Sequence, residues 1–317
     1  MRTNIGRRAI VVLIGAGVAG SLTGRARAAG KVLRIGVQKS GSLIIVRERH
    51  TLEEKLRKLG MTVAWTEFPG GPQLLEALNF GAIDFGTTGE APPIFAQAAG
   101  TALVYVGYEP PSPQGEAILV PKDSPIARIA DLKGRRVALN KGSNVHYLLV
   151  QALASVGLKP ADITSVYLAP ADARAAFERG SVDAWAIWDP FLAVAQDATG
   201  ARVLADGTNL APNRQFYLAT AALTRDYPAS LRVVLDDIGQ NDRWAQDHRA
   251  EATQLLAANM GLPPGLIALS LGRMGFGVAP LTPEVIADQQ KIADTFHALG
   301  LIPAAIDVSS AVWQPTS

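Results

Sequence analysis

"LRIGVQK" (residues 33–39) recurs 102 positions later as "RRVALNK" (135–141), with an arginine, a β-branched residue, a small residue, an apolar residue, an amide and a lysine in the same order. Each copy has the pattern of a short buried strand that ends in polar residues. A strand that recurs together with its flanking residues indicates a duplicated structural unit. These two stretches therefore predict two related halves.

A second pair of motifs follows the first at a similar distance. "FGAIDFG" (80–86) and "RGSVDAW" (179–185) share a glycine, a small residue, a β-branched residue and an aspartate. The arginine of the first motif and the glycine of the second are 47 residues apart in one half and 44 in the other. Short α/β units can converge on such patterns independently. Here the order and the interval agree as well as the composition, which favours a two-lobed protein.

The segments around these motifs alternate between strand-like and helix-like patterns. In the first half we expect strands at 32–39, 62–68, 82–89 and 102–109, and helices at 43–59, 72–81 and 91–100. A second series covers residues 117–215. Strands that alternate with helices favour parallel sheets with helices on their faces.

The last third of the chain differs from the rest in its predicted secondary structure. "QFYLATAAL" (215–223) predicts one more strand, and helical spacing dominates from Tyr227 onward. A helical block after a return strand indicates that the chain re-enters the first lobe. We therefore predict an α/β fold in which each lobe is a mostly parallel sheet flanked by helices, with two crossings at a hinge. The predicted boundaries place 31–116 and 217–317 in lobe 1 and 117–216 in lobe 2.

The N-terminal segment contains two competing motifs. "GAGVAG" (15–20) has the G-x-G-x-x-G spacing of a dinucleotide-binding turn, which needs a following amphipathic helix and an acidic residue about 20 positions on. The next ten residues have no helical apolar face, and no Asp or Glu occurs before Glu48. A basic start, an apolar centre and "ARA" (26–28) instead fit a secretory signal peptide. We predict that residues 1–28 are this signal, cleaved near Ala28.

The composition narrows the possible functions. Removing residues 1–28 takes away five of the 30 Lys and Arg residues and none of the 28 Asp and Glu residues, which leaves a net charge of −3. That balance gives no support to nucleic-acid binding. The absence of cysteine excludes disulfides and lipid attachment through an N-terminal cysteine. We expect an exported, unanchored protein of the periplasm.

The candidate binding residues lie where the predicted strands end, because ligands of open α/β sheets bind beyond the carboxyl ends of the strands. This rule selects the loops 38–42, 68–71, 87–90, 141–146 and 188–190. Within them the candidate residues are Gln38, Gly41, Phe68, Thr88, Gly89, Glu90, Ser143, Asn144, His146, Trp188 and Asp189.

Two of these loops precede helices and indicate an anion site. Ser143 is a favourable N-cap, and free N–H groups beside Ser143 and Asn144 would bind an anion. Thr88 and Gly89 precede a second helix in the same way, although a plain cap is the simpler interpretation of either loop.

Three other candidates have alternative roles. Gln38 is a neutral donor for an oxyanion, or it satisfies a turn. Glu90 would repel an anion, so its side chain either turns away to cap its own helix or meets a positive group on the ligand. Trp188 packs either against a ligand tail or in the core.

Catalytic motifs are weak. The sequence has no cysteine nucleophile, no G-x-S-x-G elbow, no H-E-x-x-H motif and no visible metal cluster. Ser143 and His146 are three residues apart on a predicted helix, which leaves an exported hydrolase as the alternative, although no acid completes a triad. We predict a binding protein without enzymatic activity and without a cofactor.

Four stretches resemble one known family. "EFPGGPQLLEALNFGAIDFGTTGEAPPIFAQAAG" (67–100), "DLKGRRVAL" (131–139), "PADARAAFERGSVDAWAIWDPF" (170–191) and "FYLA" (216–219) are similar to the aliphatic sulfonate-binding proteins of ABC importers, relatives of the taurine- and nitrate-binding proteins. The likeness extends over nearly the whole chain after residue 28.

The resemblance implies a type II periplasmic-binding-protein fold and a receptor that captures an alkanesulfonate for sulfur uptake. It implies that ligand-bound protein docks on an inner-membrane ABC permease, and we expect a monomer. Carried over residue by residue, it points to the loops of Gln38 and Gly41, Thr88 to Glu90, Ser143 and Asn144, and Trp188 and Asp189. The same fold with another small ligand, such as nitrate, taurine or a pyrimidine precursor, remains an alternative.

Overall fold

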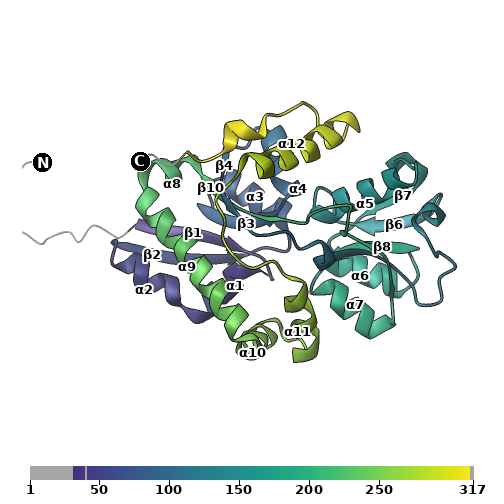
Figure 1. Cartoon of the computed structure of the whole chain (residues 1–317), viewed down its shortest axis with the longest axis horizontal. Helices are drawn as coiled ribbons and strands as arrows, with labels where there is room; N and C mark the ends of the chain where they lie inside the picture. Colours follow the sequence, from purple (N-terminus) through teal and green to yellow (C-terminus); the bar gives the residue numbers. More distant parts are fainter. Residues whose placement is uncertain (1–30, 40, 315–317) are drawn as a thin grey trace, which may run out of the picture. The chain divides into compact units, whose positions relative to one another are not determined.

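Two five-stranded sheets organise the chain in the computed structural model, which describes residues 31–39 and 41–314 (Figure 1). The predicted signal peptide, residues 1–28, lies outside the described residues.

The first sheet has the strand order β2-β1-β3-β10-β4. Its members are β1 (Lys31–Val37), β2 (Met61–Glu67), β3 (Phe85–Gly89), β4 (Leu103–Tyr108) and β10 (Gln215–Thr220). β1 pairs parallel with β2 and β3, whereas β10 pairs antiparallel with β3 and β4. The chain therefore completes this sheet only after it has built the second one.

The second sheet has the strand order β7-β6-β8-β5-β9. Its members are β5 (Glu116–Val120), β6 (Arg136–Leu139), β7 (Thr164–Tyr167), β8 (Ala184–Trp188) and β9 (Arg202–Asp206). β5, which follows the first crossing, pairs antiparallel with β8 and β9. Each sheet therefore has four strands that run in one direction and one antiparallel strand, β10 or β5, supplied by a crossing segment.

The repeated motifs occupy equivalent positions in the two sheets. Asp84 Oδ2 accepts the backbone N–H of Arg34 at 3.0 Å, and Asp183 Oδ2 accepts that of Arg136 at 2.7 Å. The glycines that precede these aspartates, Gly81 and Gly180, both have φ 67°, a left-handed conformation that glycine adopts without strain. The two motifs thus encode the same strand–turn–strand unit twice, and the predicted two-lobed α/β fold is confirmed.

Helices cover both faces of each sheet. In chain order they are α1 (Ser42–Arg49), α2 (Thr51–Arg57), α3 (Gly71–Asn79), α4 (Ala91–Ala98), α5 (Asn144–Ser155), α6 (Pro170–Glu178), α7 (Phe191–Thr199), α8 (Ala221–Asp226), α9 (Pro228–Asp247), α10 (Arg249–Met260), α11 (Pro264–Arg273) and α12 (Pro283–Ala298). Short 3₁₀ helices occupy Pro113–Gly115, Ile129–Leu132, Pro160–Asp162 and Val308–Ala311.

Three apolar clusters form the core. α1, α2, α9 and α10 pack on one face of the first sheet. α6 and α7 pack on one face of the second sheet. The third cluster includes residues of α3, α4, α5 and α12 and so draws on both sheets. Apolar burial therefore continues from one lobe to the other through α4 and α5, which are in contact.

Two predicted elements differ from the structure. The helix expected over 43–59 is divided at His50, whose φ of 53° ends α1. Five consecutive residues of α1 are buried, Ser42 to Val46, so this short helix has no single apolar face that would indicate its limits. The strand expected over 215–223 ends at Thr220, because Thr220 Oγ1 accepts the N–H of Leu223 at 3.3 Å and so starts α8.

Within residues 31–39 and 41–314, no single helix has both the length and the apolar character needed to cross a membrane. α10 and α11 meet that test only as a pair bent by 116°.

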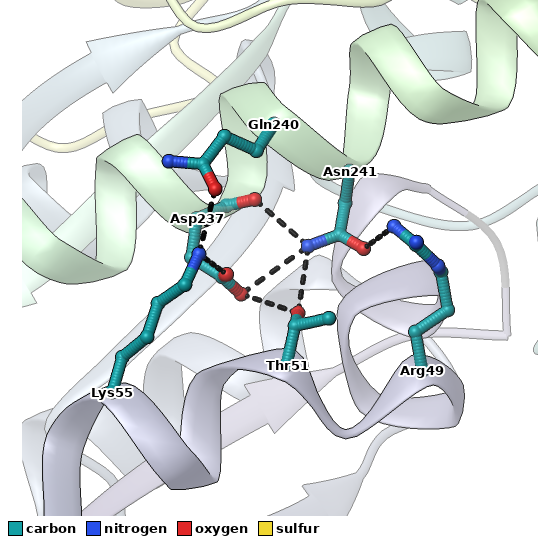
Figure 2. A network of polar contacts seen from close by, with 6 residues as sticks. All are labelled: Arg49, Thr51, Lys55, Asp237, Gln240 and Asn241. Atoms are coloured by element: carbon teal, nitrogen blue, oxygen red, sulfur yellow. Dashed lines mark hydrogen bonds and ion pairs between the residues drawn. The ribbon is translucent and has the colours of Figure 1, made fainter.

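A polar network joins α9 to α1 and α2 of the first lobe (Figure 2). The fully buried carboxylate of Asp237, on α9, pairs with Lys55 of α2 and accepts the hydroxyl of Thr51 at 2.8 Å. Asn241 Nδ2 donates to Thr51 Oγ1 at 2.8 Å, and Asn241 Oδ1 accepts from Arg49 at 2.6 Å. Since a buried carboxylate needs such partners, this network fixes α9 against α2.

We expect Asp237→Ala to lower the free energy of unfolding by about 1–3 kcal/mol, because it leaves Thr51 and Asn241 with unsatisfied hydrogen bonds at a buried site. Chemical denaturation measures the change. Asp226→Ala, which removes an exposed carboxylate paired with Arg225, is the matched control and should have little effect. Equal stability of the two variants would contradict the role assigned to the network.

Candidate ligand-binding site

A cavity of about 90 Å³ lies between strand ends and helix starts of the two lobes. Seven of the eleven predicted site residues line it: Gln38, Gly41, Gly89, Ser143, Asn144, Trp188 and Asp189. They come from both sheets, so the structure brings together loops that are up to 151 positions apart in the sequence. Among the described residues, no lysine or arginine lines this cavity.

Helix N-termini meet at the cavity without side-chain caps. α1 starts after Gly41, α3 after Gly70 and α5 after Ser143, and none of these three N-cap residues makes a side-chain capping hydrogen bond. The Ser143 hydroxyl donates instead to Asn140 O at 2.7 Å. Backbone N–H groups at these ends therefore remain available, and the helix dipoles favour an anion there.

Gly89 and Asn144 bring the two lobes close together. A Cβ atom at Gly89 would lie 2.0 Å from Asn144 Oδ1, so only glycine fits. Asn144 Oδ1 accepts the N–H of Ala91 at 3.2 Å, at the start of α4, and Asn144 Nδ2 donates to Asn213 Oδ1 at 2.6 Å. One amide thus joins α5, α4 and the second crossing.

An ion pair also connects the two lobes beside the cavity. Arg273, at the end of α11, lies 3.2 Å from Asp189 Oδ2, which follows β8. The same guanidinium donates to Gln196 Oε1 of α7 at 2.9 Å. Both charged side chains are mostly buried, with 17% and 6% of their surface exposed. The pair neutralises Asp189 where the carboxylate would otherwise repel an anion.

Glu90 does not line the cavity. Its carboxylate is fully buried and accepts the backbone N–H groups of Asn213 at 3.2 Å and Arg214 at 2.9 Å. Burial raises the pKa of Glu90 to about 7, and the contacts with Arg214 oppose that rise. Of the alternatives weighed from the sequence, Glu90 turns away from the ligand site, but it holds the crossing segment rather than capping α4.

Phe68, Thr88 and His146 are also absent from the cavity wall. Phe68 packs against the core cluster that includes α3 and α4. Thr88 lies in a strand between two lining residues, and its hydroxyl donates to Gly89 O at 3.1 Å. His146 Nδ1 accepts the N–H of Gly142 at 3.2 Å, and its ring stacks on Phe95. Thr88 faces away from the cavity because side chains alternate along a strand. Phe68 faces away because its apolar ring packs against the core.

The geometry does not favour hydrolysis by Ser143 and His146. The Ser143 proton is donated to Asn140 O, and the imidazole nitrogen Nδ1 caps a backbone N–H. Burial, with Lys141 nearby, lowers the pKa of His146 to about 4, far below the range that suits a general base. Within the part of the chain that the structure describes, no group of three or more His, Cys, Asp or Glu residues could hold a metal ion.

Several lining residues were not selected from the sequence. Asn213 and Gln215 belong to the second crossing and the start of β10, and Gly115 directly precedes β5. β5 and β10 each run antiparallel to the other strands of their own sheet, so their N-terminal ends lie at the cavity. Glu109 follows β4 at a carboxyl end, where the strand-end rule applies, but it lies outside the five loops selected from the sequence.

Carboxyl groups are buried in and around this region. Burial and nearby Asp242 raise the pKa of Glu109 to about 8. Burial and Glu90 raise the pKa of Glu116 well above its ordinary value, and neither oxygen of Glu116 has a hydrogen-bond partner among the described residues. Such groups are held in the protonated form because an ionised carboxylate is costly in an apolar environment.

The two sheets, the crossing segments and the donor-rich cavity define the periplasmic-binding-protein fold of a small-ligand receptor. A family model described as the NMT1-like family matches residues 33–260. The chain is 48% identical to a putative aliphatic sulfonates-binding protein of Escherichia coli over 287 residues, which cover 90% of each chain.

Comparison with solved structures indicates the same fold. The alkanesulfonate-binding protein SsuA of Xanthomonas axonopodis pv. citri, bound to MOPS, superposes with a TM-score of 0.86 at 44% identity, over 90% of this chain and 99% of that one. The desulfurization enzyme DSZB shares the fold alone, with a TM-score of 0.64 at 18% identity over 89% of this chain and 96% of that one.

The chain belongs to the NMT1-like family and, within it, to the family of aliphatic sulfonate-binding proteins. The resemblance inferred from the sequence is thereby confirmed.

The buried acids predict how stability depends on pH. In the folded protein Glu90 and Glu109 keep their protons to about pH 7 and 8, whereas an unfolded glutamate loses its proton near 4.5. The folded state therefore binds more protons in this window, so the free energy of unfolding falls as pH rises from about 5 to 8. We expect Glu116→Met to make this fall shallower and to stabilise the protein at pH 8. Urea unfolding at pH 5, 6.5 and 8 tests this, and parallel curves for both proteins would contradict it.

Proposed function

We propose that this chain is the periplasmic substrate-binding component of an ABC importer that captures aliphatic sulfonates. The observation that carries the proposal is the convergence of three uncapped helix N-termini on one cavity whose described wall has no lysine or arginine. The family membership supports the same class of ligand.

A sulfonate suits such a wall chemically. It stays ionised throughout the physiological pH range, so the site needs neither a proton nor a full counter-charge. Backbone N–H groups and neutral amides then provide the hydrogen bonds, and Gln38 is one such amide, with Nε2 3.0 Å from Thr87 O. Neutral donors also permit release, which delivery to a transporter requires.

The proposed site consists of the seven lining residues predicted from the sequence, together with Asn213 and Gln215 of the return crossing. We assign lobe 1 to residues 31–116 and 217–317 and lobe 2 to 117–216, with a cleaved signal at 1–28. Closure of the two lobes on the ligand would be the signal that an inner-membrane permease recognises. The protein acts as a monomer without catalysis.

Isothermal titration calorimetry identifies the ligand class. We expect heat of binding with short alkanesulfonates and little or none with sulfate, because sulfate lacks the tail and adds a second charge. Nitrate, taurine and a pyrimidine precursor belong in the same panel as alternative ligands of this fold. No heat with any sulfonate would refute the proposal.

Ser143→Asp should prevent sulfonate binding while the fold is kept. Asp is a favourable N-cap, so its carboxylate would occupy the N-terminus of α5 and repel the anion. We expect a loss of affinity of at least about 100-fold, since like charges placed together in a site cost several kcal/mol. Ser143→Ala is the matched control and should lose less than about 10-fold, because the native hydroxyl proton already bonds Asn140 O. Equal affinities of the two variants would place the anion elsewhere.

Arg273→Met should weaken binding mainly through faster dissociation. The substitution removes the ion pair with Asp189 that connects the lobes beside the cavity and keeps most of the side-chain volume. We expect the dissociation rate to rise by about 10-fold or more, as for other mostly buried charge pairs, with little change in association. Stopped-flow fluorescence measures both rates, with Arg225→Met as an exposed control. A change confined to the association rate would contradict this role.

A further inference from the structure

The repeated strand motif ends in a lysine in each lobe. Lys39 follows β1 and Lys141 follows β6, so the two lysines stand at equivalent strand ends of the two sheets. Lys39 lies in the chain between Gln38 and Gly41, and Lys141 lies two residues before Ser143; these three neighbours line the cavity. Both lysines are exposed. The motif therefore places one exposed cation beside the cavity on each lobe, outside the wall itself.

The loop of Lys141 also touches the first lobe. A Cβ atom at Gly142 would lie 3.4 Å from the ring of Phe95, on α4. The Lys141 ammonium lies 5.5 Å from the ring centroid of Tyr167, the last residue of β7, which holds it at the carboxyl edge of the second sheet. Burial, followed by the charge of Lys141, lowers the pKa of His146 to about 4. The field of this ammonium therefore reaches a side chain that is buried between the lobes.

The acids near these strand ends are neutralised. Glu67, the last residue of β2, pairs with Arg47 at 3.4 Å, and Asp189, after β8, pairs with Arg273 at 3.2 Å. Burial and a neighbouring acid raise the pKa of Glu109, after β4, to about 8, so this carboxyl group keeps its proton at neutral pH. These three acids therefore add little negative charge beside the cavity.

The two lysines are not balanced in this way. Among the described residues, neither Lys39 nor Lys141 has an ion-pair partner. Each precedes a helix N-terminus, that of α1 or α5, where the positive end of the helix dipole disfavours a cation. The two charges therefore stabilise neither an ion pair nor the helix that follows. Because the chain after residue 28 has a net charge of −3, local positive charge beside the cavity opposes the repulsion of an anion.

We propose that Lys39 and Lys141 attract the anionic ligand into the cleft and raise its rate of association, without contacting it in the cavity. This inference rests on the proposed function. Charges that flank a cleft focus the electric field there and raise the local concentration of an oppositely charged ligand. Because neither lysine belongs to the wall, the pair acts on entry of the ligand, and the neutral donors of the wall still permit its release.

Stopped-flow fluorescence with butane-1-sulfonate tests this, with Trp188 in the cavity wall as the reporter. The double variant Lys39→Gln, Lys141→Gln removes both charges. We expect its association rate constant to be lower by about 3-fold or more at about 0.1 M ionic strength, where the Debye length is about 10 Å. The dissociation rate constant should change by less than about 2-fold, because charges at the rim of a site act mainly on association. At about 1 M, where the Debye length is about 3 Å, the variant and the wild-type protein should associate equally fast.

The matched control makes the same change of charge at the opposite ends of the same strands. Lys31 begins β1 and Lys133 lies three residues before β6, and both are exposed. The 7 residues of β1 span roughly 20 Å, about twice the Debye length at about 0.1 M. The double variant Lys31→Gln, Lys133→Gln should therefore keep the wild-type association rate.

The single variants Lys39→Gln and Lys141→Gln should each slow association less than the double variant does, and a single variant as slow as the double would overturn the proposed pair. Three further results overturn the inference while the proposed function stands: an unchanged association rate in the double variant, an equal loss in the control, or an equal loss at both ionic strengths, which a structural role would produce. An effect confined to dissociation also overturns it, because it indicates direct contact with bound ligand. If butane-1-sulfonate gives no heat of binding with the wild-type protein, the proposed function fails and the inference fails with it.

Discussion

The hydrogen bonds of Glu90 determine how the two lobes meet. This carboxylate is completely buried, so the structure must provide it with donors, and it does so with two consecutive backbone N–H groups of the second crossing, at Asn213 and Arg214. The carbonyl of Glu90 accepts from Gln289 of α12 at 2.6 Å. One residue at the start of α4 therefore holds both the return of the chain and the last long helix.

The cavity depends on this arrangement because its wall is built from the same segments. Asn213 donates its N–H to Glu90, accepts from the side chain of Asn144 and lines the cavity. Glycine at position 89 lets the Asn144 amide approach the backbone of the first sheet. Hydrogen bonds within the protein thus hold these backbone donors and neutral amides in one arrangement, which lowers the entropy that binding would otherwise lose in ordering them.

Much of the fold could be predicted because the chain repeats one local sequence motif. The aspartates of "AIDFG" and "SVDAW" accept N–H groups from Arg34 and Arg136, and these short-range contacts leave a recognisable pattern in the sequence. The strand-end rule likewise selected seven residues that line the cavity. Phe68, Thr88 and His146 could not be placed, since the direction of a side chain depends on strand phase and on packing against distant residues such as Phe95.

The cavity residues that were not predicted from the sequence show where the strand-end rule fails. The rule assumes that strands run parallel, yet β5 and β10 enter each sheet in the opposite sense, so Gly115 and Gln215 reach the cavity from strand starts. These two strands also follow the crossings that connect the lobes. Under the proposed function, ligand contacts on these two strands would act on the segments that connect the lobes, whereas contacts on the parallel strands would lie within one lobe.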